Sequence, residues 1–574
     1  MKNKTYSLLF LAFQAISLIL KGRFKELSAK FQAFQSGKRG PIEVSLLGGK
    51  SLVHVWTSPH TMFLANQIIE FFHEMGIDAE IVGSSKRKTA VPTLEIVLSP
   101  TYLKFPYTRA PRIVYQLEQT TSDRWFTEQY IEYMRNSVAV FEYSEFNIPN
   151  LLSMGISINN LFYVPLGGSS KVFDASARIR VGDSKPRSGG VLIYGDFKGS
   201  SRRKDFLELA QEKILNLKVF EEKFGNSMQE ELLSSKVVLN VNYYSPGILA
   251  TPRLWESLSA GNSVVSEKSL NWSEYPEISK LVEFVEESDF DELIDRAREV
   301  SDAGTFDITT RRELIQSSEA HFRFMLARGL FGSGFADDHF YLSNMDISPK
   351  LDDVKIVLSM PETTERRYRA MKLLPQDMFF FDGVKQVPGW IGCAKSYKFL
   401  SQALLDQGVS RVVICEDDVV LPPTYESDIR VIFDYLDSIA GKWDVFVGLT
   451  ADFDHETKIY DVQEFMANRF VHCNKFTSMV FNVFSRSGLE KFAKWEINES
   501  LSDEQNTIDR FLNRDSSLIV VTLDRDIFGH DTGADSTIWL HPNSEYNSMI
   551  TRSRFIKLGL VSDWIEKSGK SKLQ

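Results

Sequence analysis

The stretch Arg411-Val-Val-Ile-Cys-Glu-Asp-Asp-Val-Val-Leu421 is an apolar run interrupted by three acids, and two prolines follow it. Residues 412–415 are apolar and mostly β-branched, which predicts a buried parallel strand that ends where the acids begin. Alternate side chains of an extended segment share a face. We therefore expect Glu416 and Asp418 to point one way and Asp417 the other.

This arrangement places two carboxylates at the carboxyl end of a strand, which is where open parallel sheets bind ligands. Carboxylate oxygens suit Mg²⁺ or Mn²⁺. Such an ion could bridge a diphosphate and neutralise it as a leaving group. A charged exit from a strand into a loop explains the same triplet when it is considered alone, so the rest of the chain has to decide between the two interpretations.

The composition limits the class of protein. A chain of 574 residues is too long for one hydrophobic core, so we expect two to four domains. Hydrophobic residues at 43% and charged residues at 25% are typical of globular proteins. The net charge of -10 argues against a nucleic-acid-binding protein, which needs a clustered basic excess. Cys393, Cys415 and Cys473 are few and far apart, which indicates a reducing cytoplasm.

Residues 1–40 form a separate basic and apolar segment. Its apolar run, residues 6–20, is shorter than the roughly 20 residues of a membrane-spanning helix and is flanked by lysine and arginine. No small-residue cleavage site follows it, which argues against a signal peptide. A helix on the protein's own body remains one interpretation. The basic flanks favour the other, a peripheral contact with the anionic cytoplasmic face of the inner membrane.

From about residue 50, short apolar strands alternate with helical patterns. Expected strands are residues 52–56, 94–98, 112–117, 138–141 and 162–165. This alternation predicts a doubly wound parallel sheet. The polar stretch 169–190 is predicted to be an interdomain linker, and a second alternating series follows it. The two halves are thus 41–168 and 190–335, and a long helix over 309–328 closes the second.

Basic residues recur in the second half. Pro252 suits the first turn of a helix, and a helix N-terminus beside Arg253 would suit a phosphate. A basic loop lies upstream: Arg202, Arg203 and Lys204. A solvated basic face is the plainer interpretation of that loop.

The stretch Thr251-Pro-Arg-Leu-Trp-Glu-Ser-Leu-Ser-Ala-Gly-Asn-Ser-Val-Val-Ser266 resembles the sugar-nucleotide segment of group 1 GT-B glycosyltransferases, especially their CgeB-like branch. The resemblance covers roughly residues 45–330. It implies that Glu256 binds the donor ribose, while Arg253 and the basic loop face the diphosphate. The broader family has a second glutamate seven or eight residues before Glu256, where this chain has Leu249 and Ile248. A non-catalytic glycan-binding scaffold is therefore the alternative for residues 41–335.

A glycine-rich turn at 329–334 and an irregular acidic stretch at 336–353 mark a boundary, and a new strand is expected at 355–359. Arg366 and Arg367 follow it, then a helix with the pattern Gly392-Cys-x-x-Ser396, then the acids. This order resembles the family 25 glycosyltransferases of lipopolysaccharide biosynthesis. Segments 443–448, 481–490 and 528–536 also match that family. Tyr397 replaces the histidine that usually follows the serine.

The second resemblance spans about residues 354–540. It implies a metal-dependent GT-A domain that transfers galactose or glucose from a nucleotide diphosphate sugar with inversion. Asp418 would bind Mn²⁺ or Mg²⁺, and His530 could complete its shell. Glu416 would contact the ribose or the metal and its water, and Arg366 and Arg367 the donor.

An inverting transfer also needs a carboxylate that accepts the proton of the acceptor hydroxyl. Three residues remain candidates: Asp452, Asp454 and Asp509.

The sequence thus predicts an α/β protein with a GT-B-like Rossmann pair followed by a GT-A-like domain at 351–574. We expect a cytoplasmic, bacterial-type glycosyltransferase that acts on a lipooligosaccharide or surface-polysaccharide acceptor. In one alternative only the C-terminal domain is catalytic and the GT-B-like module binds glycan. In the other, the whole chain is a non-catalytic carbohydrate-binding or assembly protein.

Overall fold

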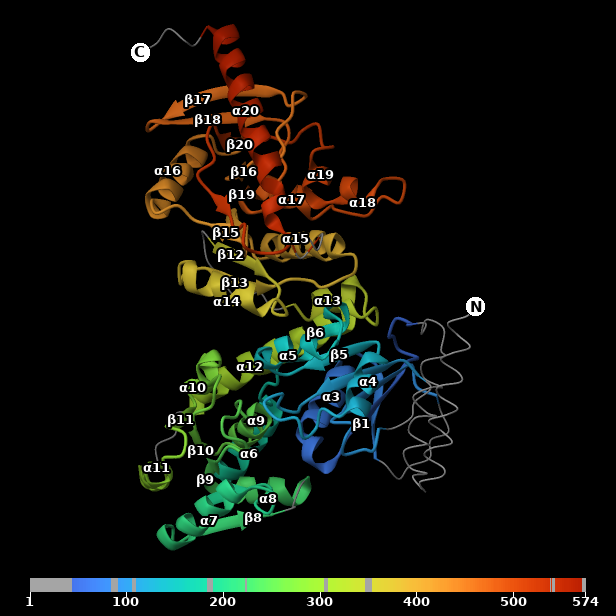
Figure 1. Ribbon diagram of the computed structural model, residues 1–574, viewed down its shortest axis with the longest axis vertical. Helices are drawn as coiled ribbons and strands as arrows, with labels where there is room; N and C mark the ends of the chain where they lie inside the picture. Colours follow the sequence, from blue (N-terminus) through green and yellow to red (C-terminus); the bar gives the residue numbers. More distant parts are fainter. Residues whose placement is uncertain are drawn as a thin grey trace. The chain divides into compact units, whose positions relative to one another are not determined.

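The computed structural model describes residues 44–83, 91–105, 110–182, 189–221, 225–303, 308–345, 354–536, 538 and 542–569. The segment predicted to contact the membrane, residues 1–40, lies outside these ranges. The chain divides into two compact units, residues 1–346 and 347–574 (Figure 1). No helix in the described ranges combines the length and the apolar character needed to cross a membrane.

The first unit begins with a wholly parallel sheet, whose strands within the described residues run in the order β2-β1-β3-β4-β5-β6. The bounds are β1 Leu52–Trp56, β2 Asp78–Val82, β3 Leu94–Leu98, β4 Arg112–Gln116, β5 Ala139–Glu142 and β6 Leu161–Tyr163. The five predicted strands are confirmed. The prediction missed β2, a half-exposed edge strand whose mixed polar and apolar residues do not form a continuous apolar run.

A second parallel sheet follows in the same unit, with the described strands in the order β11-β10-β9-β7-β8. The bounds are β7 Gly189–Tyr194, β8 Leu217–Phe220, β9 Ser235–Asn240, β10 Ser263–Glu267 and β11 Val282–Val285. The intervening helices include α7 Ser201–Lys213, α8 Asn226–Ser234, α9 Thr251–Ser259 and α11 Phe290–Ala303. The predicted doubly wound parallel architecture is confirmed for both sheets.

The predicted linker at 169–190 is wrong in its first part. Ser170–Gly182 forms helix α6, which contacts α9 and α12, the long helix Ile308–Gly332 that the sequence predicted. Phe173 is fully buried, and the hydroxyl of Ser169 accepts a hydrogen bond from the Val172 N–H at 3.3 Å. The segment is polar because only one of its faces is covered. Its helical state therefore depends on packing partners that are distant in the sequence.

The second unit, coloured yellow to red in Figure 1, contains a mixed sheet. Its described strands run in the order β13-β12-β14-β19-β16-β20-β18-β17. The bounds are β12 Val354–Ser359, β13 Phe379–Asp382, β14 Arg411–Glu416, β16 Val445–Val447, β17 Ile459–Phe465, β18 Asn468–Cys473, β19 Phe481–Ser485 and β20 Val520–Leu523. The strand predicted to lead to the three acids is β14. It is parallel to β12 but antiparallel to β19, so it is central in a mixed sheet rather than in a wholly parallel one.

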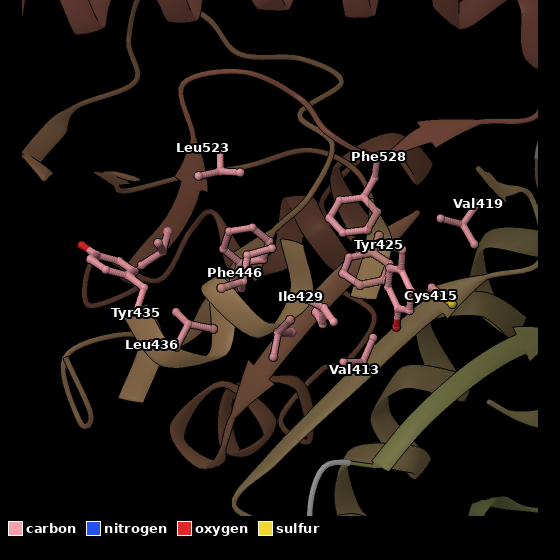
Figure 2. Close-up of a cluster of buried hydrophobic side chains, with 14 of the residues drawn as sticks. Val413, Cys415, Val419, Tyr425, Ile429, Tyr435, Leu436, Phe446, Leu523 and Phe528 are labelled. Atoms are coloured by element: carbon pink, nitrogen blue, oxygen red, sulfur yellow. The ribbon is translucent and has the colours of Figure 1, made fainter. Parts of the chain in front are cut away.

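A large apolar cluster fixes β14 in place. Val413 and Cys415 of β14 are buried in it, beside Tyr425 on helix α16, Tyr425–Ser438 (Figure 2). The rings of Phe481 and Phe528 stack with their centroids 3.8 Å apart, and Tyr425 meets both edge-on. Because β14 is held along its length, the acids that follow it occupy a defined edge of the sheet.

Helices α14 Thr364–Leu373, α15 Gly389–Asp406, α17 Arg486–Phe492, α18 Asp503–Asn506 and α19 Ile508–Leu512 belong to the same unit. A two-stranded ribbon, β15 Val419–Val420 with β21 Gly529–His530, continues from the acids. The last helix, α20 Asn547–Ser568, is anchored by Lys557, whose ammonium lies 2.7 Å from the buried carboxylate of Asp526.

Candidate functional site

The three acids after β14 divide between two surroundings. Asp417 accepts hydrogen bonds from the hydroxyl of Ser359, at 2.7 Å, and from Nε of Arg366. Glu416 and Asp418 instead line a cavity of about 780 Å³ in the second unit. The alternation predicted from the sequence is confirmed, because successive side chains diverge where β14 ends.

The cavity combines one polar cluster with apolar walls. Its charged and polar lining includes Arg366, Cys393, Glu416, Asp418, Asp509 and His530. Its apolar lining includes Trp390, Leu449, Met479, Val480, Ile508 and Ile550. These residues come from helices, strand ends and loops far apart in the sequence. A space of this size suits a small-molecule ligand with a few oriented polar contacts.

One carboxylate oxygen of Asp418 has protein partners, and the other has none among the described residues. Its Oδ2 accepts a hydrogen bond from Nδ2 of Asn543 at 2.8 Å and lies 3.3 Å from Nη2 of Arg366. Its Oδ1 is buried and has no hydrogen-bond partner among the described residues. A buried acceptor normally has a partner. The second oxygen of Asp418 is therefore available to a ligand in the cavity.

Glu416 has a perturbed acidity. Burial raises its pKa to about 8, and the negative charge of Asp418 acts in the same direction. Its Oε1 is 3.7 Å from Sγ of Cys393, which lines the same cavity. A glutamic acid of this pKa keeps its proton near neutral pH. It can then donate a hydrogen bond, which its ionised form cannot.

The three candidate bases have different locations. Asp509 lines the cavity, and its Oδ1 accepts hydrogen bonds from Thr507 Oγ1 at 2.7 Å and from the Arg510 N–H at 2.8 Å. Burial raises its pKa. Asp452 and Asp454 do not line the cavity, although Ala451 does. The structure thus brings Asp509, and not the other two, together with Glu416 and Asp418.

The partners of Asp452 and Asp454 are cations. Nη2 of Arg510 lies 2.7 Å from Oδ2 of Asp452, and Lys475 Nζ lies 2.7 Å from Oδ2 of Asp454. Burial acts to raise the pKa of Asp454, but Lys475 and the hydrogen bonds from Glu456 and Thr457 together outweigh that effect, and the pKa is lowered. A lowered pKa makes a weaker proton acceptor.

The other residues predicted for the site of this unit also differ in whether they line the cavity. Arg366 lines the cavity, whereas Arg367 does not and has its Nη1 2.7 Å from Oδ1 of Asp382. His530 lines the cavity, and its Nε2 is 3.2 Å from the carbonyl oxygen of Asn543. A carbonyl only accepts hydrogen bonds, so Nε2 carries the proton.

Among the described residues, no group of three or more histidine, cysteine, aspartate or glutamate side chains is arranged to hold a metal ion. The second unit thus does not form a complete protein cage for a cation. Its carboxylates suit an ion that takes one or two protein oxygens and completes its octahedron with water and phosphate.

In the first unit, two arginines converge on the end of β7, Arg203 buried and Arg253 half-buried. A Cβ atom added at Gly195 would lie 2.9 Å from Nη1 of Arg203 and 2.9 Å from Nη2 of Arg253. Burial lowers the pKa of Arg203, and the neighbouring Arg253 lowers it further. Nε and Nη2 of Arg203 donate to the carbonyl of Val241, and Nη1 of Arg253 donates to Oδ1 of Asn240, so each guanidinium already has a protein acceptor. Guanidinium groups also suit phosphate oxygens.

Glu256 lies close to this pair, because Tyr194 contacts both Glu256 and Arg253. The Tyr194 hydroxyl is 3.4 Å from Oε2 of Glu256, and Arg253 lies over the Tyr194 ring at 5.1 Å. Burial raises the pKa of Glu256 to about 7. The other two residues of the basic loop lie differently. Arg202 pairs with Glu267, and the side chain of Lys204 is exposed.

The residues that replace the expected second glutamate have a structural role. Ile248 and Leu249 are fully buried. The backbone N–H and carbonyl of Ile248 both bond to the amide of Gln119, at 3.0 and 3.1 Å, which joins the two sheets of the unit. The Leu249 N–H donates to Oδ1 of Asn271 at 2.8 Å. An ionised side chain at either position would replace an apolar one that is fully buried.

Sequence reasoning missed two residues of the second unit, Asn543 and Trp390. Asn543 follows the acids by 125 positions and lies in no motif. Trp390 opens α15, and its pattern in the sequence is that of an ordinary core aromatic. Only tertiary contacts identify either residue.

No family model matches the chain, and no curated protein matches it. Among solved structures, sucrose-phosphate synthase from Thermosynechococcus elongatus is 13% identical over 50% of this chain and 100% of that one, with a TM-score of 0.34. HepE from Anabaena, in complex with UDP and glucose, is 11% identical over 47% and 95%, with a TM-score of 0.33. A glycosyltransferase from Rickettsia africae is 10% identical over 48% and 93%, with a TM-score of 0.31. Likenesses of this size do not assign an activity to the chain.

Proposed function

We propose that the second unit is a GT-A-like glycosyltransferase domain of the family 25 type. It transfers galactose or glucose from a nucleotide diphosphate sugar to a hydroxyl of a lipooligosaccharide or surface-polysaccharide acceptor. The observation that carries the proposal is the unpartnered Oδ1 of Asp418, buried in a cavity that Glu416, Asp509 and Arg366 also line. A charged oxygen without a partner is costly unless a ligand satisfies it.

The donor set of the cavity suits Mg²⁺ or Mn²⁺. Asp418 and Glu416 would hold the ion with hard carboxylate oxygens, which both ions accept. The three-ligand set expected from the sequence is not formed, because His530 lines the cavity without being arranged with the two acids as a metal-binding group. When bound, the ion would supply charge neutralisation of the leaving diphosphate.

The chain's own residues supply the other steps of the proposed transfer. Arg366 remains charged beside Asp417 and Asp418 and lines the cavity, so it can bind a phosphate oxygen. Glu416, which would also hold the ion, can contact a hydroxyl of the ribose. Asp509 is the base we propose, since its raised pKa brings it closer to neutral pH and favours proton uptake from the acceptor hydroxyl.

For the first unit we propose a GT-B-like module that binds a nucleotide diphosphate. Arg203 and Arg253 would contact the phosphates, and Glu256 the ribose. Arg202 and Lys204 would play a lesser part, because the first is paired with Glu267 and the second is exposed. Donor turnover would need a second acid near Glu256.

A specific observation favours the alternative function for this unit. The backbone of Ile248 is held by Gln119 and its side chain is fully buried, so the expected position of the second glutamate serves packing. The alternative is a glycan-binding scaffold, with catalysis confined to the second unit. Both versions keep the protein in the cytoplasm, with residues 1–40 as a peripheral contact to the inner membrane near a glycolipid acceptor.

The test is nucleotide release by the full-length protein from UDP-glucose, UDP-galactose and other nucleotide sugars, with Mn²⁺ and with a chelator. We expect Asp418→Asn to lower turnover at least ~100-fold, as expected when a charge that stabilises the transition state is removed. Asp377→Asn is the matched control, since Asp377 is exposed and pairs only with Lys355 among the described residues. Undiminished turnover in the presence of the chelator, or by Asp418→Asn, would contradict the metal-dependent mechanism.

The same measurement separates the roles of the two units. If the first unit also turns over the donor, some nucleotide release persists in Asp418→Asn. Adding Arg253→Met should then lower that remaining release. If it is a scaffold, Arg253→Met leaves release unchanged, while Asp418→Asn abolishes it.

A further inference from the structure

The cavity of the second unit has a second buried polar group without a partner. Trp390, near the start of α15, is 4% exposed and lines the cavity. Its indole N–H has no hydrogen-bond acceptor in the described part of the chain. A tryptophan N–H usually has a partner when it is buried. The proposed chemistry makes no use of this donor.

Other tryptophans of the same protein show the usual arrangement. Trp443 donates its N–H to the carbonyl of Leu436 at 3.1 Å, and Trp495 to that of Asn506 at 2.9 Å. In the first unit, Trp56 donates to Glu95 at 3.2 Å. The orphaned N–H of Trp390 is thus unlike these, and it occurs where a cavity gives a ligand access.

The position of Trp390 relates it to the acid pair. Trp390 and Cys393 are three residues apart on α15, so they share a helix face and are separated by about 4.5 Å along the axis. Cys393 in turn has its sulfur 3.7 Å from Oε1 of Glu416. Trp390, Cys393 and the acid pair thus line the same cavity.

Trp390 is also connected to the candidate base. Its ring meets that of Trp495 edge-on, with the centroids 6.4 Å apart. Trp495 is hydrogen-bonded to Asn506, and the segment that follows, including Asp509, lines the cavity. The indole thus belongs to a wall that both Glu416 and Asp509 adjoin.

We infer that Trp390 recognises the transferred sugar, donating its N–H to a sugar hydroxyl while the indole packs against the C–H groups of the ring. This inference rests on the proposed function of the second unit. In a sugar transfer the reacting carbon lies between the leaving phosphate and the acceptor hydroxyl. The wall shared by the acid pair and the base is therefore where the sugar has to bind.

The test uses Trp390→Phe, which keeps an aromatic ring and removes the N–H. Calorimetry on the full-length protein with Mn²⁺ measures the Kd of UDP-glucose, UDP-galactose and UDP, and GDP-mannose and GDP serve as a second pair. We expect the variant to bind the preferred nucleotide sugar ~10-fold more weakly, the size of one lost hydrogen bond. Binding of the corresponding nucleotide without sugar should not change.

Trp443→Phe is the matched control, because that tryptophan is buried, has a protein partner and does not line the cavity. It should leave both dissociation constants unchanged. Urea unfolding adds an independent measurement. Trp390→Phe should lower stability less than Trp443→Phe, because it removes a donor that was already unpaired.

Three results would count against the inference. An equal loss of affinity for nucleotide and nucleotide sugar would place the indole on the nucleotide, and unchanged affinity for both would leave it without a ligand contact. Either result overturns the sugar contact and leaves the proposed function intact. If the wild type binds none of these compounds, the proposed function itself fails, and the inference fails with it.

Discussion

The side-chain amide of Asn543 donates a hydrogen bond to Oδ2 of Asp418 over 2.8 Å, and the two residues are 125 positions apart. Asn543 also donates to the carbonyl of Asp531 at 3.1 Å, and its own carbonyl lies 3.2 Å from Nε2 of His530. The Asp531 N–H donates to the carbonyl of Asp418 at 2.7 Å. One asparagine thus orients the acid and ties the loop after β21 to it.

Asn543→Ala should lower sugar transfer ~10–100-fold, the usual effect of removing a partner that orients a metal ligand. The loss should appear mainly as a higher Mn²⁺ concentration for half-maximal activity, since Asp418 keeps its charge but loses its fixed orientation. Activity measured against Mn²⁺ concentration checks this. Asn547→Ala, at an exposed position on α20, is the control. An unchanged Mn²⁺ dependence in Asn543→Ala would show that the bond has no such role.

Asp509→Asn should lower kcat at least ~100-fold with little change in the KM of the donor, because general-base catalysis contributes 10²–10⁴-fold. Asp452→Asn and Asp454→Asn should each have a much smaller effect, since neither residue lines the cavity. Steady-state kinetics on the three variants rank the candidates. A loss with Asp454→Asn that exceeds the loss with Asp509→Asn would reassign the base.

The stability of the first unit should fall as the pH rises because of Glu142. This glutamate is fully buried at the end of β5 and accepts hydrogen bonds from Gln116, Ser144 and Asn147 at 2.7 to 2.9 Å. Burial raises its pKa to about 8 from an ordinary value of 4.5, and the hydrogen bonds only partly oppose this. Between these two values the folded state holds a proton that the unfolded state has lost.

The contribution of Glu142 is therefore fully present below its unfolded pKa and is lost as the pH rises through its folded pKa. Urea unfolding at pH 5.5 and 8.5 should show a lower free energy of unfolding at the higher pH, and Glu142→Gln should reduce the difference. Glu128→Gln, at an exposed position, should keep the wild-type difference. The same pH difference in Glu142→Gln as in the wild type would assign it to other groups.

Lys557→Met should destabilise the protein by less than the ~3–5 kcal/mol that follows when a buried charge loses its only partner, because Arg554 still pairs with Asp526 at 2.7 Å. Lys557 and Asp526 are both fully buried, and the ammonium also donates to Thr450 Oγ1 at 2.9 Å. Urea unfolding measures the loss. Lys567→Met, exposed in the last turn of α20, should stay within about 0.5 kcal/mol of the wild type.

A double variant, Lys557→Met with Asp526→Leu, separates charge from packing. Removing both charges should recover part of the stability, because the buried carboxylate that Lys557→Met leaves with Arg554 as a partner is then removed as well. If the double variant is less stable than Lys557→Met, the loss comes from packing of α20 rather than from the charge.

Local sequence patterns were sufficient to predict most strands and the opposite directions of the side chains of the three acids. The β-branched run of β14 and the period-two alternation after it depend on neighbours one or two positions away, and both predictions are confirmed. Helix α6 was missed because its helical state depends on α9 and α12. A half-polar segment has no local signal that distinguishes a linker from a helix with one covered face.

By itself, the sequence determined the α/β alternation of the chain, the strand that leads to the acids, and the opposite directions of Glu416 and Asp417, since each of these is a short-range property of backbone geometry. Only the tertiary structure decided that Asp509 shares a cavity with Asp418 while Asp452 does not. It also decided that Asn543 holds one oxygen of Asp418 and that the N–H of Trp390 has no protein acceptor. These relationships join atoms distant along the chain, so they arise only when the helices and strands pack together.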